Sequence, residues 1–140
     1  KMPPKDMKRL ALIPKQPPTL IQLADGLLQS KKQLESVTPK VIVEEVKNIT
    51  AVQTPEQQHG SAIGAFYGDK PVEALLIAMN AVLKNPSEAI GWNNLAAMMN
   101  MTGLEHKAIP ILMHHLQNEP DNSMLLNNMG QAYLGLGDIG

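Results

Sequence analysis

Several residues in the second half of the sequence recur 34 positions apart. The pairs are Pro86 and Pro120, Asn93 and Asn127, Asn94 and Asn128, and Gly103 and Gly137. A fixed period of this length is typical of repeat proteins, in which each unit is too small to bury its apolar face alone and therefore stacks on its neighbours. The period predicts a row of similar units instead of one irregular core.

The repeating units are expected to be helical. Hydrophobic residues make up 44% of the 140 residues but aromatic residues only 3%, so the core must be built from Ala, Leu, Ile, Val and Met. A sheet would favour β-branched and aromatic side chains instead. Apolar spacing and the breaks at Gly, Pro and Asn predict helices at 55–67, 70–84, 87–101, 104–118 and 122–136. Short links make successive helices antiparallel, which predicts an all-α fold.

The first 53 residues do not follow the period. Residues 1–18 are polar and contain five prolines, which predicts an extended, solvated leader. Helices are expected at 19–36 and 39–52, although the β-branched residues at 41–43 would also suit a strand. We expect residues 19–53 to form a helical cap on the N-terminal end of the array, because the terminal unit of a stack needs a cover.

Large and small residues also recur at matching positions in each unit. In the most complete copy, the first helix has the large residues Trp92, Leu95 and Met99 and the small residue Ala96. Its second helix has the small residue Ala108 and the large residue Leu112. The last copy has Leu126, Met129, Gly130 and Tyr133. An earlier, weaker copy has Ala62, Ala74, Ala78, Ala81 and Pro86, but Gln58 stands where the aromatic residue belongs. With its 34-residue period, this pattern resembles the tetratricopeptide repeat family.

The resemblance covers residues 54–140 and implies an α-α superhelix, a solenoid of antiparallel helix pairs with two full repeats and a truncated third. In this family, partners usually lie in a concave groove lined by the first helix of each pair. Carried onto this sequence, the partner-binding positions are Tyr67, Asn93, Asn94, Ala97, Asn100, Met101, Asn127, Asn128 and Gln131. An Asn at the position of Asn94 and Asn128 often hydrogen-bonds the backbone of a bound peptide in the family. The alternative is that these asparagines only tie neighbouring helices together.

Several classes of function are disfavoured by the residues themselves. The net charge is −1, whereas a nucleic-acid-binding protein is expected to carry an excess of basic residues. No apolar run approaches the length of a membrane span. There is no phosphate-binding glycine loop, no HExxH and no cysteine, so we expect neither an enzyme nor a cofactor. His114 and His115 are adjacent on a helix and point about 100° apart, so no metal site is expected.

These observations lead to two functional hypotheses. The first is a scaffold that binds a peptide or helix of a partner protein in the concave groove. The alternative is a structural module that self-associates through the helical edge left open where the third repeat stops.

Overall fold

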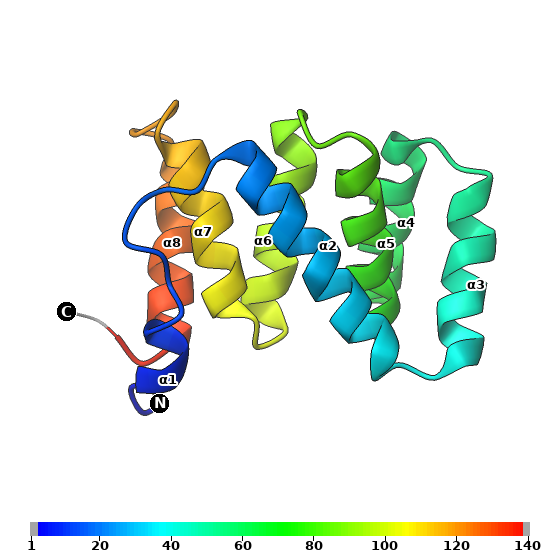
Figure 1. Ribbon diagram of the computed structural model, residues 1–140, viewed down its shortest axis with the longest axis horizontal. Coiled ribbons are helices and arrows are strands. Elements are labelled where there is room, and N and C mark those ends of the chain that lie inside the picture. The colour runs from blue at the N-terminus through cyan, green and yellow to red at the C-terminus, as the bar shows by residue number, and fades with distance from the viewer. Residues whose placement is uncertain (1–2, 139–140) are drawn as a thin grey trace. The chain divides into compact units, whose positions relative to one another are not determined.

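The computed structural model describes residues 3–138, which form eight α-helices and no β-strand (Figure 1). The helices are α1 (Met7–Leu10), α2 (Leu20–Ser36), α3 (Lys40–Ala51), α4 (Pro55–Tyr67), α5 (Pro71–Lys84), α6 (Ala89–Met101), α7 (Glu105–Leu116) and α8 (Ser123–Gly135). The predicted all-α class is confirmed. Each expected helix from residue 19 onward is present, and its ends agree to within two residues. Residues 41–43 lie in α3, so the strand alternative is excluded.

The 34-residue period also sets the helix boundaries. Helices α4, α6 and α8 begin at residues 55, 89 and 123, each 34 residues after the one before, and all three are 13 residues long. Helices α5 and α7 begin at residues 71 and 105, again 34 residues apart. The repeat therefore extends to the copy that is weakest in sequence.

The turns that end these helices repeat as well. Asp69, Gly103 and Gly137 have φ values of 61°, 80° and 75°, in the left-handed region, and lie 34 residues apart. In each case the next residue donates its N–H to the carbonyl five residues back, at 2.9 Å: Lys70 to Ala65, Leu104 to Met99, and Asp138 to Tyr133. This bond is the signature of the Schellman C-cap, in which glycine is preferred because it lacks a Cβ. Asp69 occupies this position although it is not a glycine. A comparison of residue identities between the copies therefore did not reveal this third turn.

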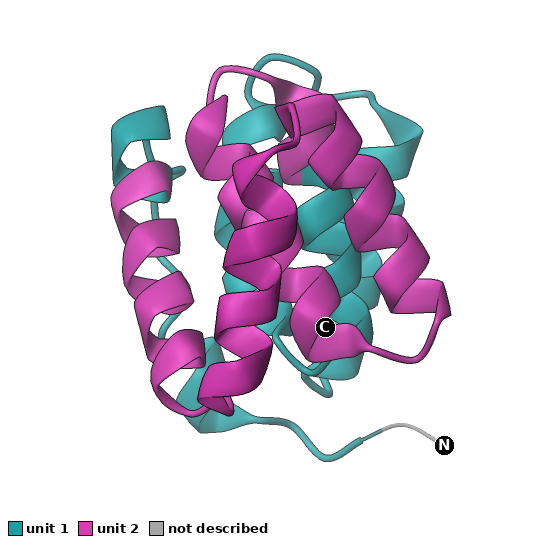
Figure 2. Ribbon diagram, turned by 90° about the vertical axis from the view of Figure 1, so that its right-hand side faces the viewer, with its two compact units in different colours: residues 1–23, 93–140 teal, residues 24–92 magenta. Residues whose placement is uncertain are grey.

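The chain divides into two compact units, which are described separately (Figure 2). Unit 2, residues 24–92, is centred on α5, in which eight of the fourteen residues are buried. Helices α3 and α4 both pack against α5. Trp92 is 1% exposed, and its indole N–H donates to the carbonyl of Pro86 at 2.8 Å. The buried Trp thus also fixes the turn that precedes α6.

Gln58, at the position expected for an aromatic residue, is completely buried in unit 2. Its side-chain NH2 donates to the carbonyls of Thr50 and Gln53, at 3.0 and 3.1 Å, and its Oε1 accepts from Asn80 at 3.0 Å. A buried amide is tolerated when its donors and acceptor are paired. The weakest copy of the repeat is therefore held by polar bonds where the middle copy is held by Trp92.

Unit 1 contains residues 1–23 and 93–140. Helices α7 and α8 pack against each other in this unit. Ile109, Ala132 and Leu136 are fully buried and form a small apolar cluster, which Met113, Met129 and Tyr133 flank. Two further side chains of this cluster, Leu10 and Ile13, come from the leader.

The leader, residues 3–18, differs from the expected extended and solvated segment. Its residues 7–10 form α1, because the Asp6 side chain caps the helix by accepting from the N–H of Arg9 at 2.9 Å. Leu10 and Ile13 are half-buried and pack on α7 and α8. The prediction weighed the five prolines and overlooked these two apolar residues. Residues 1, 2, 139 and 140 lie outside the part described.

Candidate partner-binding face

Five of the expected partner-binding residues lie on one face of α6. Asn93, Asn94, Ala97, Asn100 and Met101 are spaced at intervals of one, three and four residues, which places them on a common stripe. Asn127, Asn128 and Gln131 form the corresponding stripe on α8. All eight residues belong to unit 1, so this part of the predicted site can be described as one surface. We call it the carboxamide face.

A direct bond joins the two stripes. The Asn100 side-chain NH2 donates to the backbone carbonyl of Asn128 at 2.9 Å. Asn100 therefore connects α6 to α8, which is the structural role that the alternative gave to these asparagines. It holds the α8 stripe beside the α6 stripe.

Asn94 and Asn128 differ from Asn100 in this respect. Neither of their side-chain carboxamides has a hydrogen-bond partner within residues 3–138. Both residues are half-buried, whereas Asn127 and Gln131 are exposed. A carboxamide offers both a donor and an acceptor. The two half-buried carboxamides of Asn94 and Asn128 are therefore suited to bond the N–H and C=O groups of a peptide backbone.

Two oxygens on the carboxamide face are buried without a partner. They are Oδ1 of Asn93 and Oδ1 of Asn100, seven residues apart on α6. An unpaired buried acceptor is unfavourable by about 1–3 kcal/mol. Because protein atoms cover these oxygens, a partner would reach them only after side chains rearrange. Asn94, Asn127, Asn128 and Gln131 are the more accessible contacts.

Exposed apolar side chains lie on the face and on the same two helices. Met101 is 69% exposed at the C-terminal end of α6, and Met124 and Leu134 on α8 are about half exposed. A methionine side chain adapts its shape to different partners. The face thus offers polar groups for a backbone and flexible apolar groups beside them.

Tyr67, the ninth predicted residue, ends α4 in unit 2. Its side chain is 83% exposed, and its ring meets Phe66 edge-on with the centroids 5.9 Å apart. It is exposed to a partner, but it belongs to unit 2, whereas the carboxamide face belongs to unit 1.

Sequence reasoning missed an ionic contact in unit 1. The Arg9 guanidinium is 2.7 Å from the Glu105 carboxylate, which is only 13% exposed. The two residues are 96 positions apart, and no local pattern pairs them. The Asp6–Arg9 spacing with Leu10 and Ile13 following was the available signal that this segment could form a helical turn with one apolar side.

Burial lowers the pKa of two histidines of α7. Burial lowers the pKa of His106, and the charge of nearby Arg9 lowers it further. Burial also lowers the pKa of His115, although its Nδ1–H bond to the Ile111 carbonyl, at 2.8 Å, favours the protonated form. Across residues 3–138, no three potential metal-binding side chains of His, Asp or Glu come together.

No protein-family model, curated protein or solved structure gives a significant match to the chain. Among the helices described, none is both long enough and apolar enough to cross a lipid bilayer.

Proposed function

We propose that this protein is a binding module of the helical-repeat class, with tetratricopeptide-like helix pairs, and not an enzyme. The observation that carries the proposal is the 34-residue recurrence of helix starts, helix lengths and left-handed C-caps. Arrays of this kind present long surfaces to other proteins.

Within this class, the carboxamide face is the proposed contact with a peptide or helix of a partner protein. Asn94 and Asn128 occupy the same position of successive copies, 34 residues apart, and neither carboxamide has a hydrogen-bond partner among residues 3–138. Two such groups on adjacent helices can bond the backbone of an extended segment without regard to its side chains. Met101 would add adaptable apolar contact.

The test begins with peptides selected from a random library on the immobilised chain. Affinities are then measured by fluorescence anisotropy for the wild type and for the Asn94→Ala/Asn128→Ala variant. Each lost hydrogen bond to a neutral group contributes about 0.5–1.5 kcal/mol, so binding should weaken about tenfold or more. The melting temperature should change little, because neither carboxamide forms a hydrogen bond within the described part of the chain.

Asn48→Ala is the matched control, since Asn48 is an exposed asparagine in the helix α3. It should leave peptide affinity unchanged. Equal affinities for the wild type and the double variant would refute the assignment of the face. Parallel losses of affinity and melting temperature would mean that the asparagines are structural.

The alternative, self-association through the edge of the last helix, carries a requirement of its own. The leader already contacts that edge, because the Asp6 N–H donates to the Leu136 carbonyl at 2.8 Å. Assembly there would have to displace the leader first.

A further inference from the structure

The leader contacts α7 and α8 through backbone, apolar and ionic interactions, and the carbonyl of Pro18 at its end lies 2.7 Å from Nδ1 of His114 on α7. Its backbone bonds to Leu136, as described above. Leu10 and Ile13 pack against the cluster of Ile109, Ala132 and Leu136. Arg9 pairs with Glu105 at 2.7 Å. Backbone, apolar and ionic contacts together make this a specific mode of docking.

Two glycines allow close approaches at the C-terminal end of α8, Gly137 to the leader and Gly135 to Glu105 of α7. A Cβ on Gly137 would collide with the backbone of Pro4, and φ at this residue is 75°. A Cβ on Gly135 would collide with the Glu105 carboxylate, which receives Arg9. The surface is therefore shaped to receive both the leader backbone and its arginine.

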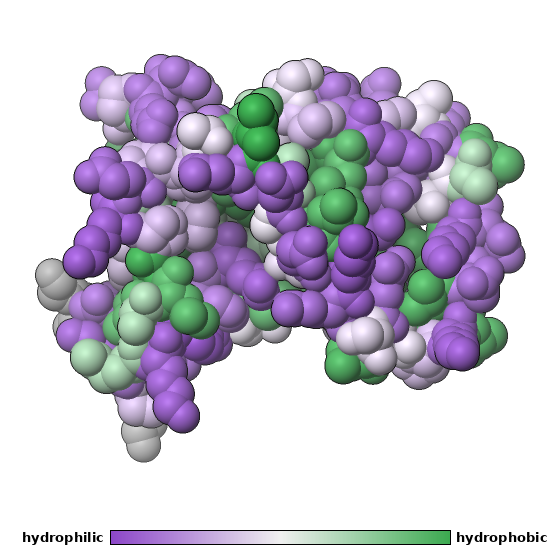
Figure 3. All heavy atoms as spheres, in the orientation of Figure 1, coloured by the Kyte–Doolittle hydropathy of each residue, from purple (hydrophilic) through white to green (hydrophobic). Residues whose placement is uncertain are grey.

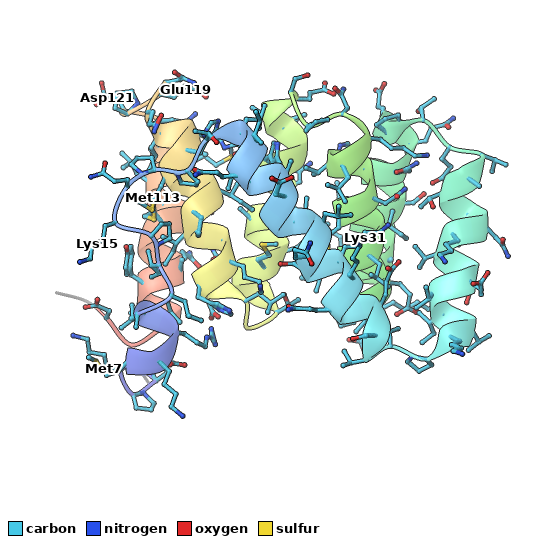
Figure 4. All side chains as sticks on the ribbon, viewed as in Figure 1. Met7, Lys15, Lys31, Met113, Glu119 and Asp121 are labelled. Atoms are coloured by element: carbon cyan, nitrogen blue, oxygen red, sulfur yellow. The ribbon has the colours of Figure 1, made fainter. Side chains whose placement is uncertain are left out.

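The leader is attached to this surface by few residues. Helix α1 has four residues and none of them is buried, while Met7 and Leu12 are 65% and 68% exposed. Apolar surface remains visible over this part of the chain (Figure 3). In Figure 4, Lys15 points away from the helices, and Met113 lies on α7 on the side along which the leader runs. A segment held by so few side chains can be released without unfolding the helices beneath it.

We propose that the surface under the leader is a second docking face, separate from the carboxamide face, and that the leader is its built-in competitor. The face consists of Glu105, which pairs with Arg9, and of the cluster on which Leu10 and Ile13 pack, formed by Ile109, Ala132 and Leu136. The partner it fits is a short amphipathic protein segment with an arginine followed by aliphatic residues one and four positions later. The leader itself displays this chemistry in Arg9, Leu10 and Ile13. Such a partner replaces the leader, and the free leader then becomes exposed.

The experiment uses the full chain and a fluorescein-labelled peptide of residues 3–18 as the probe. In the Leu10→Ser/Ile13→Ser variant, the intramolecular leader loses its apolar contacts while the docking face keeps all its residues. This variant should bind the peptide at least tenfold more tightly than the wild type, whose face is occupied. Leu12→Ser is the control, because Leu12 is an exposed aliphatic residue of the same segment. It should bind the peptide like the wild type.

A charge exchange tests the chemistry of recognition. Adding Glu105→Arg to the Leu10→Ser/Ile13→Ser chain should weaken peptide binding at least tenfold. A peptide carrying Arg9→Glu should restore much of that affinity. If the serine variant is unstable by circular dichroism, Arg9→Glu in the full chain provides a second way to release the leader.

The proposal is overturned if the peptide binds none of the released chains. It is also overturned if the exchanged peptide fails to recover affinity for the Glu105→Arg chain, since the arginine would then not be recognised. A wild-type dimer in sedimentation that Leu10→Ser/Ile13→Ser abolishes would assign the face to the leader of a second copy and reject an outside partner. None of these outcomes depends on Asn94 or Asn128, so this proposal and the proposed function can fail independently.

Discussion

At the scale of the residue, Gln58 shows how a polar side chain can replace a large apolar one in a repeat. Its amide is completely buried and makes three hydrogen bonds in unit 2. In a low-dielectric interior such bonds are strong, but any group left unpaired is costly.

Gln58→Leu should therefore destabilise the protein although it makes the core more apolar. The substitution leaves the Asn80 side-chain NH2 and two backbone carbonyls without this partner. We expect the free energy of unfolding to fall by about 2–4 kcal/mol, measured by urea denaturation. Gln29→Leu, at an exposed site in α2, should change it by less than about 0.5 kcal/mol. An unchanged stability for Gln58→Leu would mean that the three bonds contribute nothing net.

At the scale of the element, each first helix of a pair ends in the same left-handed turn. Glycine occupies that position in two copies and Asp69 in the third. A residue with a Cβ is strained in this conformation, although Asp tolerates it better than most residues do.

Asp69→Gly should raise the free energy of unfolding, by about 0.5–1 kcal/mol, because it removes this strain. Gly103→Ala should have the opposite effect, a loss of about 1 kcal/mol. Asp25→Gly provides the comparison inside a helix, where glycine is unfavourable, and should lower stability. Thermal denaturation of the three variants distinguishes these effects. A lower stability of the Asp69→Gly protein would contradict this prediction, because it would show that the Asp69 side chain stabilises the turn by more than its backbone strain costs.

The elements were also the scale at which sequence was most informative. Apolar spacing and Pro, Gly and Asn breaks placed every helix from residue 19 onward, because these signals are local. The third C-cap was missed because its φ is visible only in the backbone. Within the site, helical spacing grouped the residues of α6 and of α8, but which asparagine is paired could not be predicted. The Asn100 bond depends on how two helices meet.

At the scale of the whole molecule, the buried His115 and the half-buried His106 link stability to pH. Burial lowers the pKa of His106 and His115 below the ordinary value of 6.5. Arg9, Lys107 and His114 act in the same direction, while Glu105, Asp6 and Glu119 act against it. Below pH 6.5 the unfolded chain therefore binds more protons at these imidazoles than the folded chain does.

Stability should accordingly be unaffected by these groups at pH 7.5 and should decrease as the pH falls through about 6.5 toward the lowered pKa values. Melting temperatures measured from pH 7.5 to 5.5 should fall in the wild type. His115→Phe keeps a ring of similar shape but cannot titrate, so its melting temperature should depend less on pH. A steeper dependence in this variant would contradict the assignment.

The bond between Asp6 and Leu136 joins residues about 130 positions apart. On a ribosome, Leu136 is made long after Asp6. At about 5–20 residues per second, the delay is roughly 7–26 seconds. Throughout that interval α1 has no surface to dock on, and its apolar side chains stay open to whatever the nascent chain meets. The hydrogen bond between Asp6 and Leu136 can therefore form only after the chain has been synthesised as far as Leu136.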